Sequence, residues 1–207
     1  MITSNKYIPK SLQEIDKWQL SRRVFIKNIA FLGLISQIPF ATSCLNSSNN
    51  EDEKYLTLSD EEIEIALKVQ QILLPNDGIG PDAKKINADT YLAWVLSDKN
   101  MDIEDKNFII NGITWVNEAS NKEFSMDFLK LDSHKSKLLI AKISNLDWGE
   151  TWLSVMLTFV IEALLSDPIY GGNPDKIGWL WLQHTAGSPN PTKDLAYGNF
   201  LKTVGAE

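Results

Sequence analysis

Few residues in this 207-residue chain could carry chemistry. It has two histidines, His134 and His184, and one cysteine, Cys44. A haem attachment site needs Cys-x-x-Cys-His, and a zinc site usually needs three or four nitrogen, sulfur or oxygen ligands. Neither set can be assembled from these residues, and no Gly-x-Ser-x-Gly segment supplies a serine nucleophile. The sequence therefore predicts no catalytic, cofactor-binding or metal-binding residue in this chain.

Two glycine turns, GIGPD at 78–82 and YGGN at 170–173, resemble loops that bind phosphate. A phosphate-binding loop of that kind follows a strand and opens a helix, and no predicted strand precedes either turn. Acidic pairs such as Asp60 and Glu61 stand at the start of predicted helices, where carboxylates complement the helix dipole. We interpret these acidic pairs as solvated helix starts.

The stretch LLSDPIYGGNPDKIGWLW at 164–181 encodes a reversal of defined shape. Adjacent glycines allow positive φ, asparagine tolerates it, and the following proline fixes the next φ. Two interpretations remain open: a loop packed against its own domain, or a rigid surface that offers Tyr170, Trp179 and Trp181 to a partner protein. The partner-binding hypothesis rests on Tyr170, Gly171, Gly172, Asn173 and Trp179.

The N-terminal end has the pattern of an export signal. Residues 1–43 carry six Lys or Arg and two acids, and paired arginines precede an apolar run at 29–41 that is too short to cross a bilayer. The segment SRRVFIK at 21–27 resembles the twin-arginine signal S-R-R-x-F-L-K of bacteria. Its key residues are Arg22, Arg23 and Phe25, and the expected partner is the twin-arginine translocase. A buried N-terminal helix is the alternative interpretation.

Cys44 follows the small residues Ala41, Thr42 and Ser43, and this ATSC segment resembles a bacterial lipobox. We expect lipidation of the thiol and a lipid anchor in the membrane, with residues 44–57 as a flexible tether. A thiol without chemistry is the alternative. These patterns together predict a protein of the bacterial periplasm or cell envelope.

The charge of the chain is divided unevenly. The whole chain carries −7 and residues 1–43 carry +4, which leaves −11 for residues 44–207. An acidic body of this kind is repelled by phosphate backbones, so the composition argues against a nucleic-acid partner.

The hydrophobic pattern predicts an all-α fold, an irregular bundle of about five helices within residues 58–207. The first helix is expected to have Ser59 as its N-cap, with Glu62 completing a capping box, and to stop at Pro75. A glycine-, proline- and aromatic-rich loop region follows the last helix. Further helices are predicted at about 84–96 and 103–119, from about Ser133 as a cap, and at 148–165.

The helix predicted at 148–165 is the most apolar. Its sequence, WGETWLSVMLTFVIEALL, contains two charged residues, Glu150 and Glu162. We expect it to be the central helix, covered on most sides by the others. A membrane span is the alternative, although its length lies at the lower limit for one.

The segment SDPIYGGNPDKIGW at 166–179 resembles the signature S-D-P-x-Y-G-G-N-x-x-x-x-G-W of the gluconate 2-dehydrogenase subunit 3 family. The segment LLPNDGIGPDAKKINADTYLAWVLSD at 73–98 is similar to a second stretch of the family, although Pro81-Asp82 departs from it. The resemblance covers about residues 58–190. The family has no established catalytic residues of its own to transfer.

The resemblance implies a small subunit of a bacterial dehydrogenase complex. In such complexes a flavoprotein large subunit with FAD oxidises a sugar, sugar acid or polyol, often with a cytochrome c subunit that holds haem c. The small subunit supports maturation and export of the large one. Two rival hypotheses are an independent exported enzyme that uses an acid such as Asp175 or Glu162, and a structural envelope lipoprotein.

Overall fold

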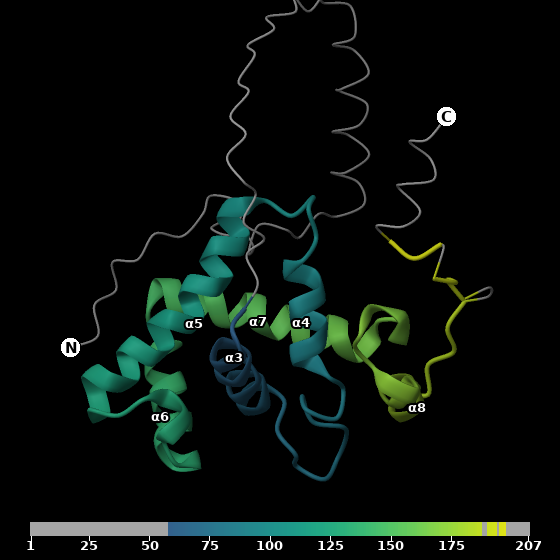
Figure 1. Ribbon diagram of the computed structural model, residues 1–207. Helices are drawn as coiled ribbons and strands as arrows, with labels where there is room; N and C mark the ends of the chain where they lie inside the picture. The colour runs from purple at the N-terminus through teal and green to yellow at the C-terminus, as the bar shows by residue number, and fades with distance from the viewer. Residues whose placement is uncertain (1–57, 188–189, 194, 198–207) are drawn as a thin grey trace, which may run out of the picture. The chain divides into compact units, whose positions relative to one another are not determined.

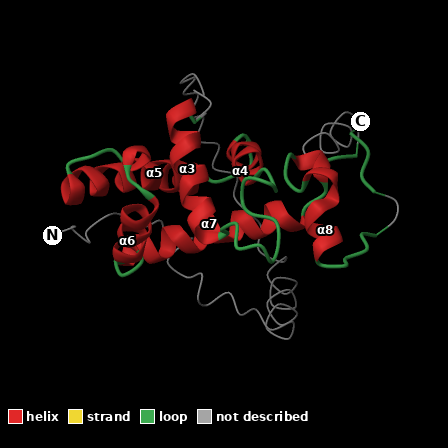
Figure 2. Ribbon diagram, turned by 90° about the horizontal axis from the view of Figure 1, so that it is seen from below, coloured by secondary structure: helices red, strands yellow, loops and turns green. Residues whose placement is uncertain are grey.

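The computed structural model describes residues 58–187, 190–193 and 195–197. These residues form helices joined by turns and contain no strand, which confirms the all-α prediction (Figures 1 and 2). The predicted signal, with Arg22, Arg23 and Phe25, and the predicted lipidation site Cys44 lie outside the described residues. The α-helices are α3 (Asp60–Leu73), α4 (Ala88–Leu96), α5 (Ile103–Phe124), α6 (Ser133–Ile143), α7 (Asp147–Leu165) and α8 (Ile177–Trp181). Short 3-10 turns lie at Phe128–Lys130, Pro168–Tyr170 and Pro174–Lys176.

Helix α3 begins with the predicted capping box. The Ser59 hydroxyl oxygen accepts from the Glu62 N–H at 3.3 Å, and the Glu62 carboxylate accepts from the Ser59 N–H at 2.8 Å. The two bonds satisfy backbone groups that a helix start otherwise leaves unpaired. The helix ends at Leu73, two residues before Pro75.

Three predicted boundaries differ from the structure. Helix α4 starts at Ala88, not near 84, because Asn87 adopts left-handed φ and interrupts the helical backbone. Helix α5 continues past 119 to Phe124 and ends where Ser125 turns left-handed. The cap of α6 is Asp132, whose carboxylate accepts from the Lys135 N–H at 2.8 Å, so Ser133 is already the first helical residue.

Helix α7 is the element that the other helices share. It packs against α3, α4, α5 and α8, and extends from α6 to α8 in both ribbon views. Trp152 is fully buried; its indole N–H donates to the Ile109 carbonyl at 3.0 Å, and its ring lies where a side chain on Gly112 would be. The glycine in α5 therefore lets the two helices approach closely.

The opposite face of α7 is open. Its apolar residues Leu157, Ile161 and Leu165 are 40–46 % exposed. Among the described helices, α7 has the length and the apolar composition of a helix that could cross a membrane, and half of its apolar stretch is buried in the protein. Its contacts with four other helices are those of a core helix, although it is less completely covered than the sequence predicted.

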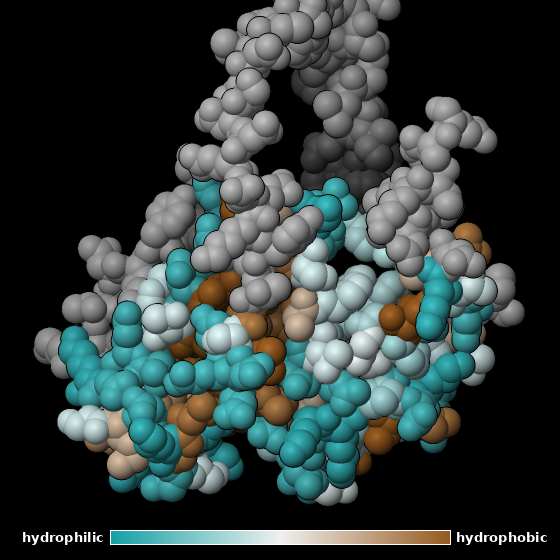
Figure 3. All heavy atoms as spheres, viewed as in Figure 1, coloured by the Kyte–Doolittle hydropathy of each residue, from teal (hydrophilic) through white to brown (hydrophobic). Residues whose placement is uncertain are grey.

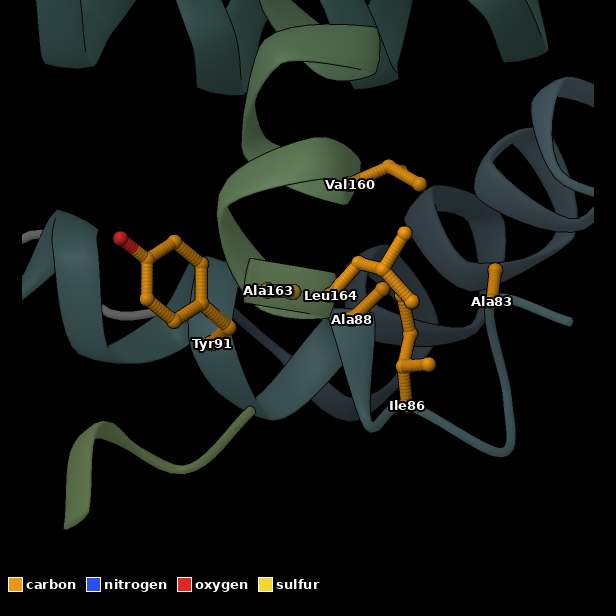
Figure 4. Packing of buried hydrophobic residues seen from close by; sticks show 7 residues of the cluster. All are labelled: Ala83, Ile86, Ala88, Tyr91, Val160, Ala163 and Leu164. Atoms are coloured by element: carbon orange, nitrogen blue, oxygen red, sulfur yellow. The ribbon is translucent and has the colours of Figure 1, made fainter. Parts of the chain in front are cut away.

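A hydrophobic cluster joins α4 to the second half of α7. Ile86 and Ala88 meet Leu164 between the two helices, and the Tyr91 hydroxyl points away from them (Figure 4).

Lys68 of α3 connects this helix to the segment between α5 and α6. Its ammonium group donates to three carbonyls of the segment between α5 and α6, those of Phe128, Leu129 and Leu131, at 2.7–3.1 Å.

Candidate functional site

The turn after α7 is built from backbone conformations that few residues adopt. Gly171 has φ +92°, and three non-glycine residues, Asn173, Asp175 and Lys176, also have positive φ. A left-handed residue other than glycine costs about 1–2 kcal/mol, and Asn and Asp bear it best. The surrounding contacts must therefore hold this segment in place.

Asn173 is the centre of those contacts. It is fully buried, and its side-chain amide donates to the Ser166 carbonyl at 3.0 Å and accepts from the Gly178 N–H at 2.7 Å. Its backbone N–H donates to the Ile86 carbonyl at 2.9 Å, just before α4. One residue thus connects the end of α7, the start of α8 and the segment that leads into α4.

Two glycines bring the turn against the backbone of α7. A Cβ on Gly172 would lie 2.7 Å from the Ala163 carbonyl oxygen, and one on Gly178 would overlap the Leu164 carbonyl oxygen. Because the backbone atoms cannot move aside, any side chain at either position would displace the turn. The glycines of the signature are required by this close approach.

Trp179 is a core residue, which corrects the prediction that it offers its ring to a partner. It is 7 % exposed, and its indole N–H donates to the Leu165 carbonyl at 2.7 Å. The last carbonyls of a helix have no partner within the helix, and this bond satisfies one of them in α7. Gly172 and Asn173 are likewise buried, so their contribution to a partner surface can only be indirect.

Tyr170 belongs to an aromatic cluster with Trp94 of α4 and Tyr197 of the C-terminal segment. The Tyr170 and Trp94 ring centroids are 4.7 Å apart, and those of Trp94 and Tyr197 are 6.4 Å apart. The Tyr170 hydroxyl accepts from the Tyr197 N–H at 3.3 Å. The ring is half-buried, and Gly171 beside it packs against Thr90. Tyr170 therefore connects the turn to the C-terminal segment.

The outer side of α8 is apolar and open. Leu180 is 74 % exposed, Trp181 40 % and Leu182 46 %, and nearby Ile79 is 75 % exposed. Hydrophobic surface lies over α8 at the lower right of Figure 3. The sequence pointed to Trp181 and missed Ile79 and Leu180. The one available signal for Ile79 was an isoleucine between two glycines in a polar loop.

The family model of gluconate 2-dehydrogenase subunit 3 matches the sequence over residues 60–187. The chain belongs to this family. The matched region begins with the first residue of α3 and ends just beyond α8, so the family domain includes every helix described above together with the turn. No curated protein and no solved structure matches the chain.

The family domain holds one carboxyl group with a distinctive setting. The Tyr91 hydroxyl donates to the Glu162 carboxylate at 3.2 Å. Burial raises the pKa of Glu162, and burial together with the nearby carboxylate raises the pKa of Tyr91. Asp175, the other acid of the enzyme hypothesis, is exposed in the turn.

Possible metal ligands are scattered. Within the described ranges no three His, Cys, Asp or Glu side chains gather into a metal-binding group. His134 and His184 are both exposed, and the His184 and Trp179 rings form a T-shaped pair with centroids 5.8 Å apart.

Proposed function

We propose that this chain is the non-catalytic small subunit of an exported FAD-dependent dehydrogenase complex that oxidises a sugar, sugar acid or polyol. The family match across residues 60–187 carries the proposal, because members of a subunit family act together with partner subunits. The FAD would belong to the flavoprotein large subunit, and haem c to a cytochrome subunit where one is present. The small subunit would support folding, stability and export of the large one.

The arrangement of the turn supports a binding role. Its buried polar groups bond to the ends of α7 and α8 and to the segment before α4, so their hydrogen-bonding capacity is used within the chain. Outside it, α8 presents apolar side chains to solvent. Rigid apolar surface suits a protein interface, and the oxidation chemistry would be supplied by the cofactor of the partner.

The N-terminal pattern gives a physical reason for a partnership. A flavoprotein that binds FAD in the cytoplasm must cross the membrane folded, and the twin-arginine route carries folded proteins. A signal at Arg22 and Arg23 on a bound small subunit would export both chains. The lipid anchor proposed at Cys44 would then hold the complex at the membrane.

Co-purification tests the proposal. We expect the tagged full chain, expressed with the flavoprotein encoded beside it, to purify as a yellow complex with dehydrogenase activity, and the chain alone to be colourless and inactive. Turnover by the isolated chain would instead make it an enzyme. If the two chains do not associate, the subunit proposal is wrong, and the hypothesis of a structural envelope lipoprotein remains.

Export provides a second test. Arg22→Lys with Arg23→Lys keeps the charge and removes the planar guanidinium groups that a receptor can recognise. We expect dehydrogenase activity to remain in the cytoplasm of cells that carry this double variant. Normal envelope activity would contradict a shared twin-arginine signal.

A further inference from the structure

A groove lies between α8 and the loop that follows α3. Its walls are Ile177 and Trp181 on one side, and Asn76, Lys85 and the segment 78–81 on the other. Its volume is about 280 Å³. Pockets that enclose small molecules usually occupy about 300–1,000 Å³, so this groove suits one or two protein side chains better than a cofactor such as FAD.

Trp181 is fixed in this groove although it is exposed. A Cβ on Gly80 would lie 2.5 Å from the indole ring, so the ring packs directly on the glycine backbone. An aromatic side chain that is already immobilised loses little conformational entropy on binding. Trp181 therefore has both properties of an interface anchor, exposed apolar area and a fixed position.

The strained turn places α8 where it forms the groove. Asp175 and Lys176 keep their left-handed conformations immediately before the helix, and Asn173 bonds to the first turn of the helix through the Gly178 N–H. Trp179 points inward in the same five-residue helix, and Leu180 and Trp181 point outward. The internal contacts of the turn thus fix the position of the outer surface of α8, although the residues of that surface take no part in those contacts.

The charges at the groove favour one kind of occupant. Among the described residues that line it, Lys85 is the one with a charged side chain. A second copy of the chain, docked symmetrically, would bring Lys85 close to its own counterpart. It would also bring together two bodies in each of which residues 44–207 carry −11. A different protein with an apolar side chain beside a carboxylate complements both features of the groove.

We propose that this groove is the docking site for the flavoprotein large subunit, and that it receives an apolar side chain of that subunit flanked by an Asp or Glu that pairs with Lys85. The inference rests on the proposed function, because it assigns a surface to the partner named there. Trp181 in the groove and Leu180, the exposed residue that precedes it in α8, supply the apolar contact, and Lys85 supplies orientation and charge selectivity.

The test compares variants of the full chain in titrated pull-downs with the co-encoded flavoprotein. Leu180→Ser and Trp181→Ala are each expected to raise the Kd about tenfold or more, and Lys85→Glu to raise it with a weaker dependence on salt than the wild type shows. Ile161→Ser is the matched control, because Ile161 is an apolar residue 46 % exposed on the open face of α7. It should leave the Kd within about twofold.

Folding is checked in each variant by thermal melting. Leu180 is 74 % exposed, so its variant should melt like the wild type even if Trp181→Ala does not. If the wild-type chain binds the flavoprotein and both Leu180→Ser and Lys85→Glu bind it with the same affinity, the groove is not the docking site, and the proposed function stands. Wild-type failure to bind at all would overturn the proposed function. A wild-type homodimer that Leu180→Ser dissociates would assign the groove to a second copy and also overturn the inference.

Discussion

Replacing Asn173 with alanine tests whether one buried amide holds the turn after α7. The substitution removes two hydrogen bonds and leaves the Ser166 carbonyl and the Gly178 N–H without their partners. Each buried group left unsatisfied costs about 1–3 kcal/mol. Alanine at φ +49° adds about 1–2 kcal/mol of backbone strain that asparagine largely avoids. We therefore expect the free energy of unfolding to fall by about 3–5 kcal/mol. This is below the upper limit of the added costs, because water can bond to part of the exposed polar groups.

The assay is urea unfolding of the purified chain followed by far-ultraviolet circular dichroism. Asn173→Gly separates the two contributions, because glycine loses the same hydrogen bonds without the strain and should be about 1 kcal/mol more stable than the alanine variant. Asn107→Ala is the matched control. Asn107 is exposed on α5, and its substitution should change stability by less than about 0.5 kcal/mol.

Two results would refute the reasoning. A loss of less than about 1 kcal/mol in Asn173→Ala would mean that the amide bonds contribute little or that water replaces them fully. Equal stability of the alanine and glycine variants would mean that the left-handed backbone is not strained at this position. In the first case the position of α8 would depend on Trp179 and the close packing of the glycines, and not on the Asn173 amide.

Three further predictions follow from other residues. Lys68→Met should lower the free energy of unfolding by about 2–3 kcal/mol, because three carbonyls lose a charged donor; urea unfolding measures it, and an unchanged midpoint would contradict it. Burial raises the pKa of Glu162 above its usual 4.5, so ionisation of this carboxyl lowers the stability of the folded chain. The free energy of unfolding of Glu162→Gln should therefore rise relative to that of the wild type as pH rises from below 4.5 to neutral. A difference between the two chains that does not change with pH would argue against this. Cys44→Ser should abolish labelling by radioactive palmitate and release the chain from membranes; equal labelling of both chains, or of neither, would exclude lipidation at Cys44.

The helices could be predicted because their determinants are local. Ser59 and Glu62 are three residues apart, and apolar residues repeat at helical spacing along each segment, so neither signal needs the rest of the chain. The sequence also indicated a tight reversal at 170–174, because its glycines, asparagine and proline restrict their own backbone. The helix boundaries were harder to predict. At the start of α6 two adjacent residues, Asp132 and Ser133, have side chains that can cap a helix, and the backbone conformation makes the aspartate the N-cap.

The tertiary structure decided which residues of the turn face inward. Trp179 and Trp181 are two positions apart and chemically alike, yet the first bonds to the Leu165 carbonyl in the core and the second packs over Gly80 at the surface. No periodic pattern distinguishes them, because the backbone around them follows neither a strand nor a long helix. Their environments depend on α7 and on a loop about a hundred residues earlier in the chain, and only folding brings these segments to α8.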